Sequence, residues 1–275
     1  MTDDINWKVG VVQMDCSLGD VAANLERIGN FAEAGAKLGV ELLIYPETVT
    51  TGYFISAMLD KLAEPADGPS AKAIGKIAAA NALHLAAGMV TREGNRFFDS
   101  QLLFSPEGQL LAEYRKVHLF AAEREWYSPG DRPVVVETRL GMIGLSVCYD
   151  LIFPDYIRRL TEIGADIVIN STNWISDGYQ REVWGWGGPG VAGLAATRAL
   201  ENVTFVAMAD RVGHEQGFTS LGHSCVAGPS GKLFASLQDG EGMAVADIAI
   251  PGEDLDRWRG IATYREDRRP EVYAD

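Results

Sequence analysis

The segment MIGLSVCYD, residues 142–150, is an apolar run that ends abruptly in a cysteine, a tyrosine and an aspartate. A short run that is apolar at nearly every position is typical of a β-strand covered on both faces. Five other segments have the same character: Val9–Met14, Val40–Tyr45, Leu83–Val90, Asp166–Asn170 and Val203–Met208. We therefore expect a set of buried strands at the centre of the molecule.

Segments with helical periodicity lie between these runs. Apolar residues recur at a spacing of three or four in residues 24–38, 70–83, 154–163 and 189–201. Pro154 suits the first position of a helix, because a proline there loses no intrahelical hydrogen bond. The pattern predicts helices that cover the outer faces of the strands.

Two hairpins are also expected, because turn residues join pairs of strand-like segments. The first pair is Phe97–Phe104 with Leu110–Tyr114, and the second is Ser224–Ala227 with Lys232–Leu237. Together with the helices, these segments indicate a mixed α/β fold in which two sheets pack together. No linker-like stretch divides residues 1–275, so we expect one domain.

Composition narrows the class of protein. The chain has 275 residues, 47% of them hydrophobic, and a formal net charge of −14, which argues against nucleic acid or an anionic membrane as a partner. The sequence has neither an apolar run of about 18 residues nor a basic, apolar leader, so we expect a cytoplasmic protein. Three cysteines far apart predict neither a disulfide framework nor a zinc site.

The C-terminal tail, residues 252–275, is heavily charged and contains Trp258, Tyr264 and Tyr273. Charge alone predicts a solvated end. The spaced aromatic residues instead favour a tail that packs along a surface, such as that of a partner subunit.

Reactive side chains follow three of the apolar runs, where sites gather in α/β sheets. Glu47 follows the run Val40–Tyr45, and Cys148 follows the run 142–147. Asn173 and Trp174 follow the run Asp166–Asn170. A cysteine at a tight strand-to-helix turn presents its thiol outward and places the next backbone N–H, that of Tyr149, where an oxyanion would form. A free cysteine taken alone is more often a packed core residue.

Lys116 favours a catalytic role for Cys148 over a packed core position. It lies among apolar residues after a predicted strand, in Tyr114–Leu119, and Glu123 follows on the next loop. A lysine there either extends to solvent or supplies a fixed positive charge that favours the thiolate and stabilises an oxyanion.

In order and spacing, Pro46-Glu47, the segment Tyr114–Leu119 and the segment Gly144–Asp150 resemble the three motif blocks of the nitrilase superfamily. The resemblance extends over roughly residues 7 to 250. It implies a four-layer α-β-β-α sandwich, a homodimer or larger homo-oligomer, and a catalytic triad that needs neither metal nor cofactor. Members often have Asn where this chain has Asp210, a difference we expect to concern structure.

The resemblance also implies a role for each residue. Glu47 is the general base, Lys116 stabilises the oxyanion, Cys148 is the nucleophile, and Glu123 positions substrate and lysine. Nitrilases of this superfamily usually follow the nucleophile with Trp-Glu, whereas Tyr149-Asp150 is more similar to amidases. We therefore expect hydrolysis of a small-molecule amide through a thioester, with N-carbamoyl compounds and nitriles as alternatives.

Aromatic and amide side chains near these blocks are candidates for the substrate pocket. They are Tyr53, Phe54, Phe120, Tyr149, Asn173 and Trp174, with Trp184 or Trp186 as further candidates. The glycine-rich stretch 185–190 is expected to be a mobile loop. It lacks the lysine and hydroxyl residue of a phosphate-binding loop.

Other functional classes fit the sequence less well. A metal-dependent phosphohydrolase needs clustered histidines and carboxylates, but His84, His118, His214 and His223 are scattered. The chain has no G-x-S-x-G motif for a serine hydrolase and no nucleotide-binding domain that a glutaminase subunit would feed. A catalytically idle binding or scaffold protein would be expected to lack one triad member, and none is missing. The sequence leaves open the acyl group, the stereochemical preference and the oligomer size.

Overall fold

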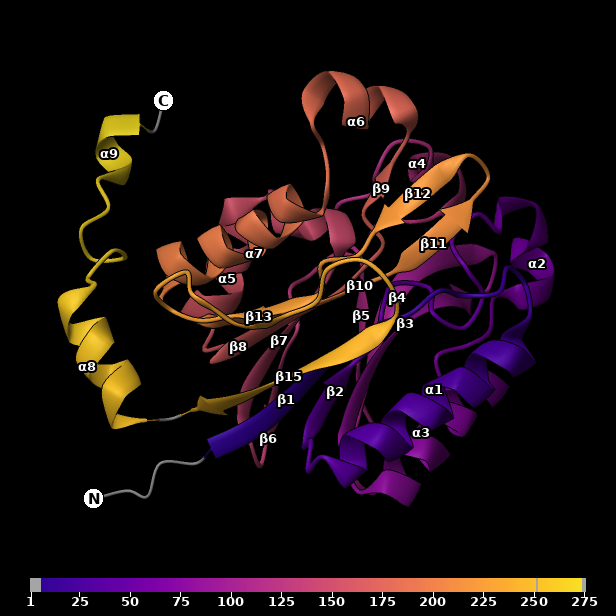
Figure 1. Ribbon diagram of the computed structural model, residues 1–275, viewed down its shortest axis with the longest axis horizontal. Coiled ribbons are helices and arrows are strands. Elements are labelled where there is room, and N and C mark those ends of the chain that lie inside the picture. The colour runs from indigo at the N-terminus through magenta and orange to yellow at the C-terminus, as the bar shows by residue number, and fades with distance from the viewer. Residues whose placement is uncertain (1–5, 251, 274–275) are drawn as a thin grey trace.

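Two six-stranded β-sheets pack face to face at the centre of the molecule (Figure 1). The computed structural model describes residues 6–250 and 252–273. Helices cover the outer face of each sheet, so the chain forms the four layers α-β-β-α that the sequence predicts. No helix in the described ranges is long and apolar enough to cross a membrane.

The first sheet has the strand order β15-β1-β2-β3-β4-β5. Its strands are β1 (Asn6–Gln13), β2 (Leu42–Ile44), β3 (His84–Glu93), β4 (Arg96–Phe104), β5 (Leu110–Arg115) and β15 (Gly242–Ala249). The central strands β1, β2 and β3 are parallel, and the outer neighbours pair antiparallel. Two helices, α1 (Val21–Lys37) and α3 (Pro69–Asn81), cover this sheet and bury Ile28 and Ile74.

The second sheet has the strand order β14-β13-β10-β8-β7-β6. Its strands are β6 (Val135–Thr138), β7 (Gly141–Val147), β8 (Ile167–Thr172), β10 (Phe205–Asp210), β13 (Cys225–Ala227) and β14 (Leu233–Ser236). Strands β7, β8 and β10 are parallel. The helices α5 (Pro154–Glu162) and α7 (Gly188–Asn202) cover its outer face.

The largest hydrophobic cluster lies between the sheets and under the helices of the second sheet. Trp7 and Val11 of β1 and Leu145 of β7 belong to it and have no exposed surface. All six residues of β8 are buried, which explains why its first half, residues 167–169, is apolar without alternation, while its polar second half, residues 170–172, is buried as well. Since both sheets share this cluster, the loops at their strand ends are held in fixed relation.

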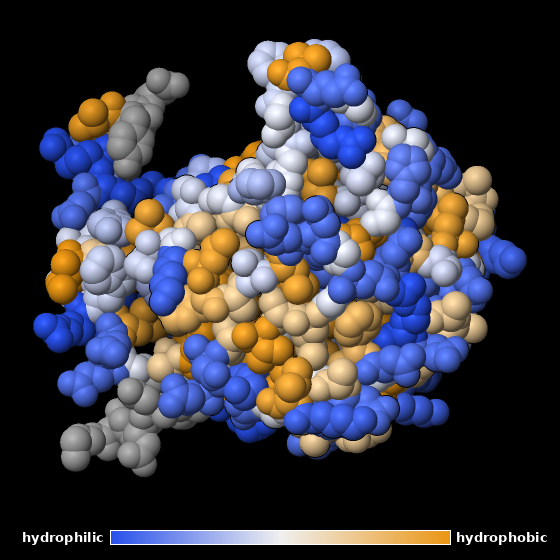
Figure 2. Space-filling view, in the orientation of Figure 1, coloured by the Kyte–Doolittle hydropathy of each residue, from blue (hydrophilic) through white to orange (hydrophobic). Residues whose placement is uncertain are grey.

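Smaller elements surround the strand ends. A three-stranded sheet has the order β11-β12-β9, formed by β9 (Ile175–Ser176), β11 (Val212–Glu215) and β12 (Phe218–Leu221). Helix α6 (Gly178–Trp184) follows β9 and projects from the body of the molecule at the top of Figure 1. Figure 2 shows hydrophilic and hydrophobic side chains mixed on this helix. The short helices are η1 (Ser56–Met58), α2 (Leu59–Leu62), α4 (Glu123–Trp126) and η2 (Cys148–Ile152).

Two sequence-based boundaries are wrong. The run Val203–Met208 was expected as a strand, but α7 continues to Asn202, Val203 adopts a left-handed conformation with φ of 49°, and β10 begins only at Phe205. The expected loop 185–190 is also shorter, since α7 already begins at Gly188. A Cβ at Gly188 would lie 1.8 Å from the His223 ring, so the helix start packs too closely for any side chain.

The C-terminal tail forms α8 (Glu253–Ile261) and α9 (Pro270–Tyr273). It is fixed to its own chain through the buried Leu255 and through the indole N–H of Trp258, which donates to the Pro229 carbonyl at 3.2 Å. The tail therefore does pack along a surface. Its contact with a partner subunit stays a prediction.

Candidate active site

Chain segments that follow strands of both sheets bring Glu47, Lys116 and Cys148 into one buried region. Glu47 lies in the loop after β2, Lys116 directly follows β5, and Cys148 directly follows β7. Glu47 and Lys116 have no exposed surface, and Cys148 is 5% exposed. Glu47 and Lys116 are close enough for their charges to affect the pKa of Cys148.

Lys116 is the centre of a charged cluster. Its ammonium lies 2.6 Å from Glu47 Oε1, 2.9 Å from Glu123 Oε1 and 3.1 Å from Asp99 Oδ2. Burial acts to lower the pKa of Lys116, but the Glu123, Glu47 and Asp99 carboxylates outweigh it and raise that pKa well above its ordinary value. The lysine therefore keeps its charge over the whole physiological pH range.

Asp99 is a member of this cluster that the sequence reasoning missed. It lies in β4, within a segment predicted as an apolar strand, and its backbone carbonyl accepts the Lys116 N–H at 2.8 Å. The available signal was a carboxylate next to two phenylalanines inside a strand. Such a residue is rarely buried without a partner.

Glu123 is held from three directions. Its Oε1 accepts from Lys116 at 2.9 Å and from the Tyr53 hydroxyl at 2.6 Å, and its Oε2 accepts the Phe120 backbone N–H at 2.7 Å. Because these contacts fix its carboxylate, Glu123 can position the Lys116 ammonium.

The Glu47 turn depends on a glycine in the neighbouring strand. A Cβ at Gly88 of β3 would lie 2.5 Å from the Glu47 Cα and 2.6 Å from the Pro46 carbonyl. Gly88 N–H donates to that carbonyl, and the Val49 N–H donates to the Gly88 carbonyl. The absence of a side chain therefore allows the turn to lie directly against β3.

Cys148 begins η2 with φ of +42°, a left-handed conformation that non-glycine residues seldom adopt. Burial raises the pKa of its thiol well above the ordinary value, Glu47 raises it further, and Lys116 lowers it. The resting residue is therefore a thiol, and attack on a substrate requires a base.

Asp150 joins the Cys148 turn to the Lys116 segment. Its Oδ2 accepts the Tyr114 hydroxyl at 2.6 Å and the Val147 N–H at 3.0 Å. Its Oδ1 accepts the His118 backbone N–H at 3.0 Å and lies 2.8 Å from His118 Nδ1. The sequence placed Asp150 and His118 in the motif blocks without a role, and their geometry assigns them the alignment of the two segments.

A cavity of about 170 Å³ opens at Cys148. Five predicted residues line it, together with Ile152, Ile175 and Gln180: Phe120, Tyr149, Asn173, Trp174 and Trp186. Asn173 is fixed by the Ser220 hydroxyl at 2.6 Å, and the Trp174 and Trp186 rings meet edge to face with centroids 5.8 Å apart. None of the lining residues carries a full charge at neutral pH, so the cavity suits a small uncharged group.

The remaining pocket candidates lie elsewhere. Tyr53 approaches Glu123 rather than the cavity, and Phe54 stacks on Phe218 with centroids 5.3 Å apart. Trp184 is 73% exposed on α6, where it donates to the Tyr179 hydroxyl at 3.2 Å. Periodicity and proximity in sequence could not separate these residues from true lining residues.

Within the described part of the chain, Glu47, Asp99 and Glu123 are the one group whose ligand atoms are close enough to hold a metal ion. The Lys116 ammonium lies within 3.1 Å of an oxygen of each. Lys116 thus supplies the cation of this cluster, and a metal ion would have to displace it.

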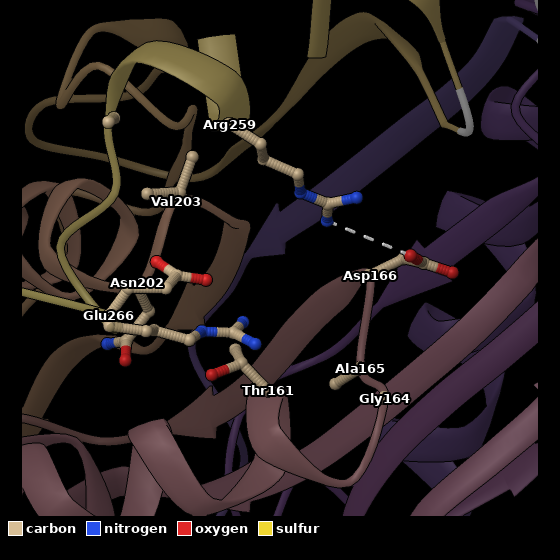
Figure 3. A pocket seen from close by; sticks show the side chains of 10 residues that line it. Thr161, Gly164, Ala165, Asp166, Asn202, Val203, Arg259 and Glu266 are labelled. Carbon is tan, nitrogen blue, oxygen red and sulfur yellow. Dashed lines mark ion pairs between the residues drawn. The ribbon is translucent and has the colours of Figure 1, made fainter. Parts of the chain in front are cut away.

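A second cavity, of about 300 Å³, lies under the C-terminal tail (Figure 3). Arg259 of α8 reaches toward Asp166 there, with 3.9 Å between nitrogen and oxygen, and Arg265 and Glu266 complete the charged lining. It shares no lining residue with the cavity at Cys148. We assign it to packing of the tail.

Comparison with known proteins agrees with this geometry. A model of the carbon-nitrogen hydrolase family matches residues 8–259. The chain belongs to this family. It is therefore a hydrolase of carbon–nitrogen bonds other than peptide bonds.

Individual relatives resemble the chain over nearly its whole length. The (R)-stereoselective amidase of a Pseudomonas species is 33% identical over 263 residues, covering 95% of this chain and 91% of its own. A probable nitrilase of Schizosaccharomyces pombe is 30% identical and covers 96% of both chains. The solved structure of a double mutant of the amidase from Nesterenkonia sp. AN1, in complex with acrylamide, superimposes with a TM-score of 0.83 at 26% identity, covering 98% of this chain and 96% of that one.

Proposed function

We propose that this hydrolase converts small, uncharged carboxylic amides to the acid and ammonia through a thioester on Cys148. One observation supports this most directly. The Lys116 ammonium, bound at 2.6 Å by Glu47 and at 2.9 Å by Glu123, lies beside a cysteine that opens onto an uncharged cavity. A base, a fixed cation and a nucleophile are the groups that acyl transfer requires.

In the first half-reaction, Glu47 accepts the thiol proton as the Cys148 sulfur attacks the amide carbon. Lys116 and the backbone N–H of Tyr149 stabilise the oxyanion, each worth about 3 kcal/mol as in comparable sites. The carbon–nitrogen bond then breaks, Glu47 returns the proton to the leaving nitrogen, and ammonia departs. Burial suits Glu47 to both steps, because it raises the pKa of that carboxyl well above its usual range and so makes the carboxylate a stronger base.

In the second half-reaction, water attacks the thioester and Glu47 accepts its proton. Lys116 and Tyr149 stabilise the second oxyanion as they do the first. The carbon–sulfur bond breaks, the carboxylic acid leaves, and the proton returns to the sulfur of Cys148. Glu123 contributes by positioning Lys116, with which it forms the 2.9 Å ion pair.

The cavity favours a neutral acyl group. Its lining is aromatic, aliphatic and amide in character, as with Phe120, Asn173 and Gln180. ω-Amides of dicarboxylic acids and N-carbamoyl amino acids carry a carboxylate, which would be desolvated there without a cation to pair with it. Neutral aliphatic or aromatic amides fit this environment, and uncharged N-carbamoyl compounds or nitriles remain the alternative substrates.

An ammonia-release screen tests the proposal. The panel contains short neutral amides, ω-amides, N-carbamoyl compounds and nitriles, and we expect the highest kcat/KM for the neutral amides. Mass spectrometry during turnover should detect an acyl group on Cys148. Cys148→Ala is the control and should release no ammonia.

Three results would contradict the proposal. Turnover with Cys148 unmodified in every rapid-quench sample would exclude the thioester. Failure to release ammonia from any compound would instead favour an idle binding protein, and preference for the carboxylate-bearing substrates would refute the neutral acyl group.

A further inference from the structure

Asp99 adds a third carboxyl group to a site that needs only two for the proposed chemistry. Glu47, Asp99 and Glu123 each offer an oxygen within 4.8 Å of the others, and among the described residues Lys116 is the one cation that forms ion pairs with them. If all three were ionised, the cluster would carry a net charge of −2 with almost no solvent contact. Burying that much uncompensated charge is unfavourable, so the cluster is expected to bind a proton.

The hydrogen-bond partners show where that proton is needed. Glu47 Oε2 and Asp99 Oδ1 are both fully buried, and neither accepts a hydrogen bond from a donor group among the described residues. Both oxygens of Glu123, by contrast, have donors. A carboxylic acid proton on the first pair would provide a donor where the protein provides none.

We infer that Glu47 and Asp99 share one proton in the resting enzyme, and that Asp99 thereby acts as a positioning residue that keeps Glu47 able to accept the thiol proton. The pair then carries a single negative charge, which Glu47 presents toward Lys116. This inference rests on the proposed function for its consequence in catalysis. The shared proton itself depends only on the buried cluster.

The other titratable groups around the pair do not compete for this proton. Burial raises the pKa values of Tyr53 and Tyr127 well above their ordinary value, so both remain neutral. Lys116 is protonated, and Cys148 rests as a thiol. Burial also raises the pKa values of both Glu47 and Asp99, the direction expected for two carboxyl groups that retain a proton.

Infrared spectroscopy of the resting enzyme provides a direct test, since a carboxylic acid C=O stretch is resolved from carboxylate bands. Asp210, outside this cluster, is a further buried carboxyl group whose pKa is raised by burial, so the measurement uses the Asp210→Asn background. At neutral pH we expect one carboxylic acid band in that background and its loss in the Asp210→Asn/Asp99→Asn double variant. Absence of the band from the single variant, or its survival in the double variant, would overturn the inference.

Kinetics provide the second readout. Asn keeps the shape and neutral charge of a protonated Asp99, so Asp99→Asn should retain kcat within about threefold. Asp99→Ala leaves Glu47 Oε2 without a partner and should lower kcat by about tenfold or more, with little change in KM. A large loss of kcat in Asp99→Asn would mean that Asp99 acts as an ionised group and would contradict the shared proton.

The outcomes separate the two proposals. The infrared band is measured without substrate, so it can appear and disappear as expected even if no amide is hydrolysed. Thermal unfolding of each variant checks that it folds. If Asp99→Ala fails to fold, the infrared comparison of Asp210→Asn with Asp210→Asn/Asp99→Asn still tests the shared proton.

Discussion

Asp210 is a carboxyl group placed where an amide would suffice. Its Oδ1 accepts the backbone N–H groups of Trp174 at 3.0 Å and Arg211 at 2.8 Å, while its buried Oδ2 has no donor among the described residues. Burial raises its pKa well above the ordinary value of 3.8, although those hydrogen bonds oppose the shift. The side chain is thus best accommodated in its neutral form, which agrees with a structural role.

We predict that the Asp210→Asn variant gains stability relative to the wild type as the pH rises. The unfolded aspartate ionises near its ordinary pKa, whereas the folded one resists ionisation, so the wild type loses stability as the pH rises from that value toward the folded pKa. Asparagine removes this loss. Chemical denaturation between about pH 5 and pH 8 should show the advantage of the variant growing by at least about 1 kcal/mol. A difference that does not change with pH would show that Asp210 titrates normally.

The three cysteines should differ in reactivity. Burial raises the pKa values of Cys16 and Cys225 to about 12, and neither lines the substrate cavity. Cys148 is also a thiol at rest but has the Glu47 carboxylate nearby, which is the base in the proposed mechanism. Iodoacetamide, itself a small amide, is therefore expected to label Cys148 alone in the native protein.

Peptide mapping after alkylation measures this labelling. Glu47→Gln should slow it by about tenfold or more, because the base is lost. Cys148→Ala should remain unlabelled until it is denatured. Native labelling at Cys16 or Cys225 would contradict the assignment.

At the scale of elements, sequence patterns predicted the parts whose burial is uniform. The buried runs and the amphipathic helices appear as strands and helices within a few residues of their expected bounds, for example at β7 and α5. β15 was missed because its burial alternates and small residues such as Gly242 and Ala244 weaken its apolar signal. The small sheet β11-β12-β9 was missed because its strands are short and partly exposed.

The candidate site likewise contains residues that a local sequence pattern could place and residues that it could not. Motif order placed Glu47, Lys116 and Cys148 together because each follows a strand whose pattern is plain. Asp99 and the role of Asp150 depend on pairing between β4 and β5 and on contacts across the chain, which no local pattern encodes. Tyr53 and Phe54 show the converse, since closeness to Glu47 in sequence did not place their rings at the cavity.

The segment between α6 and α7 should set the size of the acyl group. Trp186 lines the cavity and packs against Trp174, whereas Trp184, two residues earlier, is exposed. Trp186→Ala is expected to enlarge the cavity and to raise kcat/KM for longer acyl chains relative to short ones by about tenfold, the value of roughly one or two buried methylenes. A series of straight-chain amides measures the shift.

Trp184→Ala is the matched control for that series, because it removes an indole from the end of α6, two residues before Trp186, where the side chain does not line the cavity. It should leave the chain-length preference unchanged. An equal shift in both variants would mean that movement of α6, rather than the Trp186 side chain, governs selectivity.

At the scale of the whole molecule, the C-terminal tail carries apolar side chains that its own chain leaves uncovered. Leu255 and Trp258 fix α8 to the body, but Ile261 is 68% exposed, Val272 66% and Tyr264 41%. Figure 1 shows α8 and α9 at one edge of the molecule, beyond α5. Exposed apolar side chains on a segment anchored at its first helix favour a further contact, which here would be a second copy of the chain.

We therefore predict a homodimer or larger homo-oligomer held partly by this tail. Light scattering coupled to size-exclusion chromatography should give at least twice the chain mass of 29.8 kDa. A chain ending at Ile250 should dissociate at a higher protein concentration than the full-length chain, and Ile261→Asp with Val272→Asp should do the same without removing the anchor at Trp258. Because the active-site cluster lies between the sheets of one chain, the dissociated variants should retain the Cys148 labelling described above. A full-length chain that stays monomeric, or a truncated chain with the same number of subunits and the same dissociation concentration as the full-length one, would show that the tail serves only its own subunit.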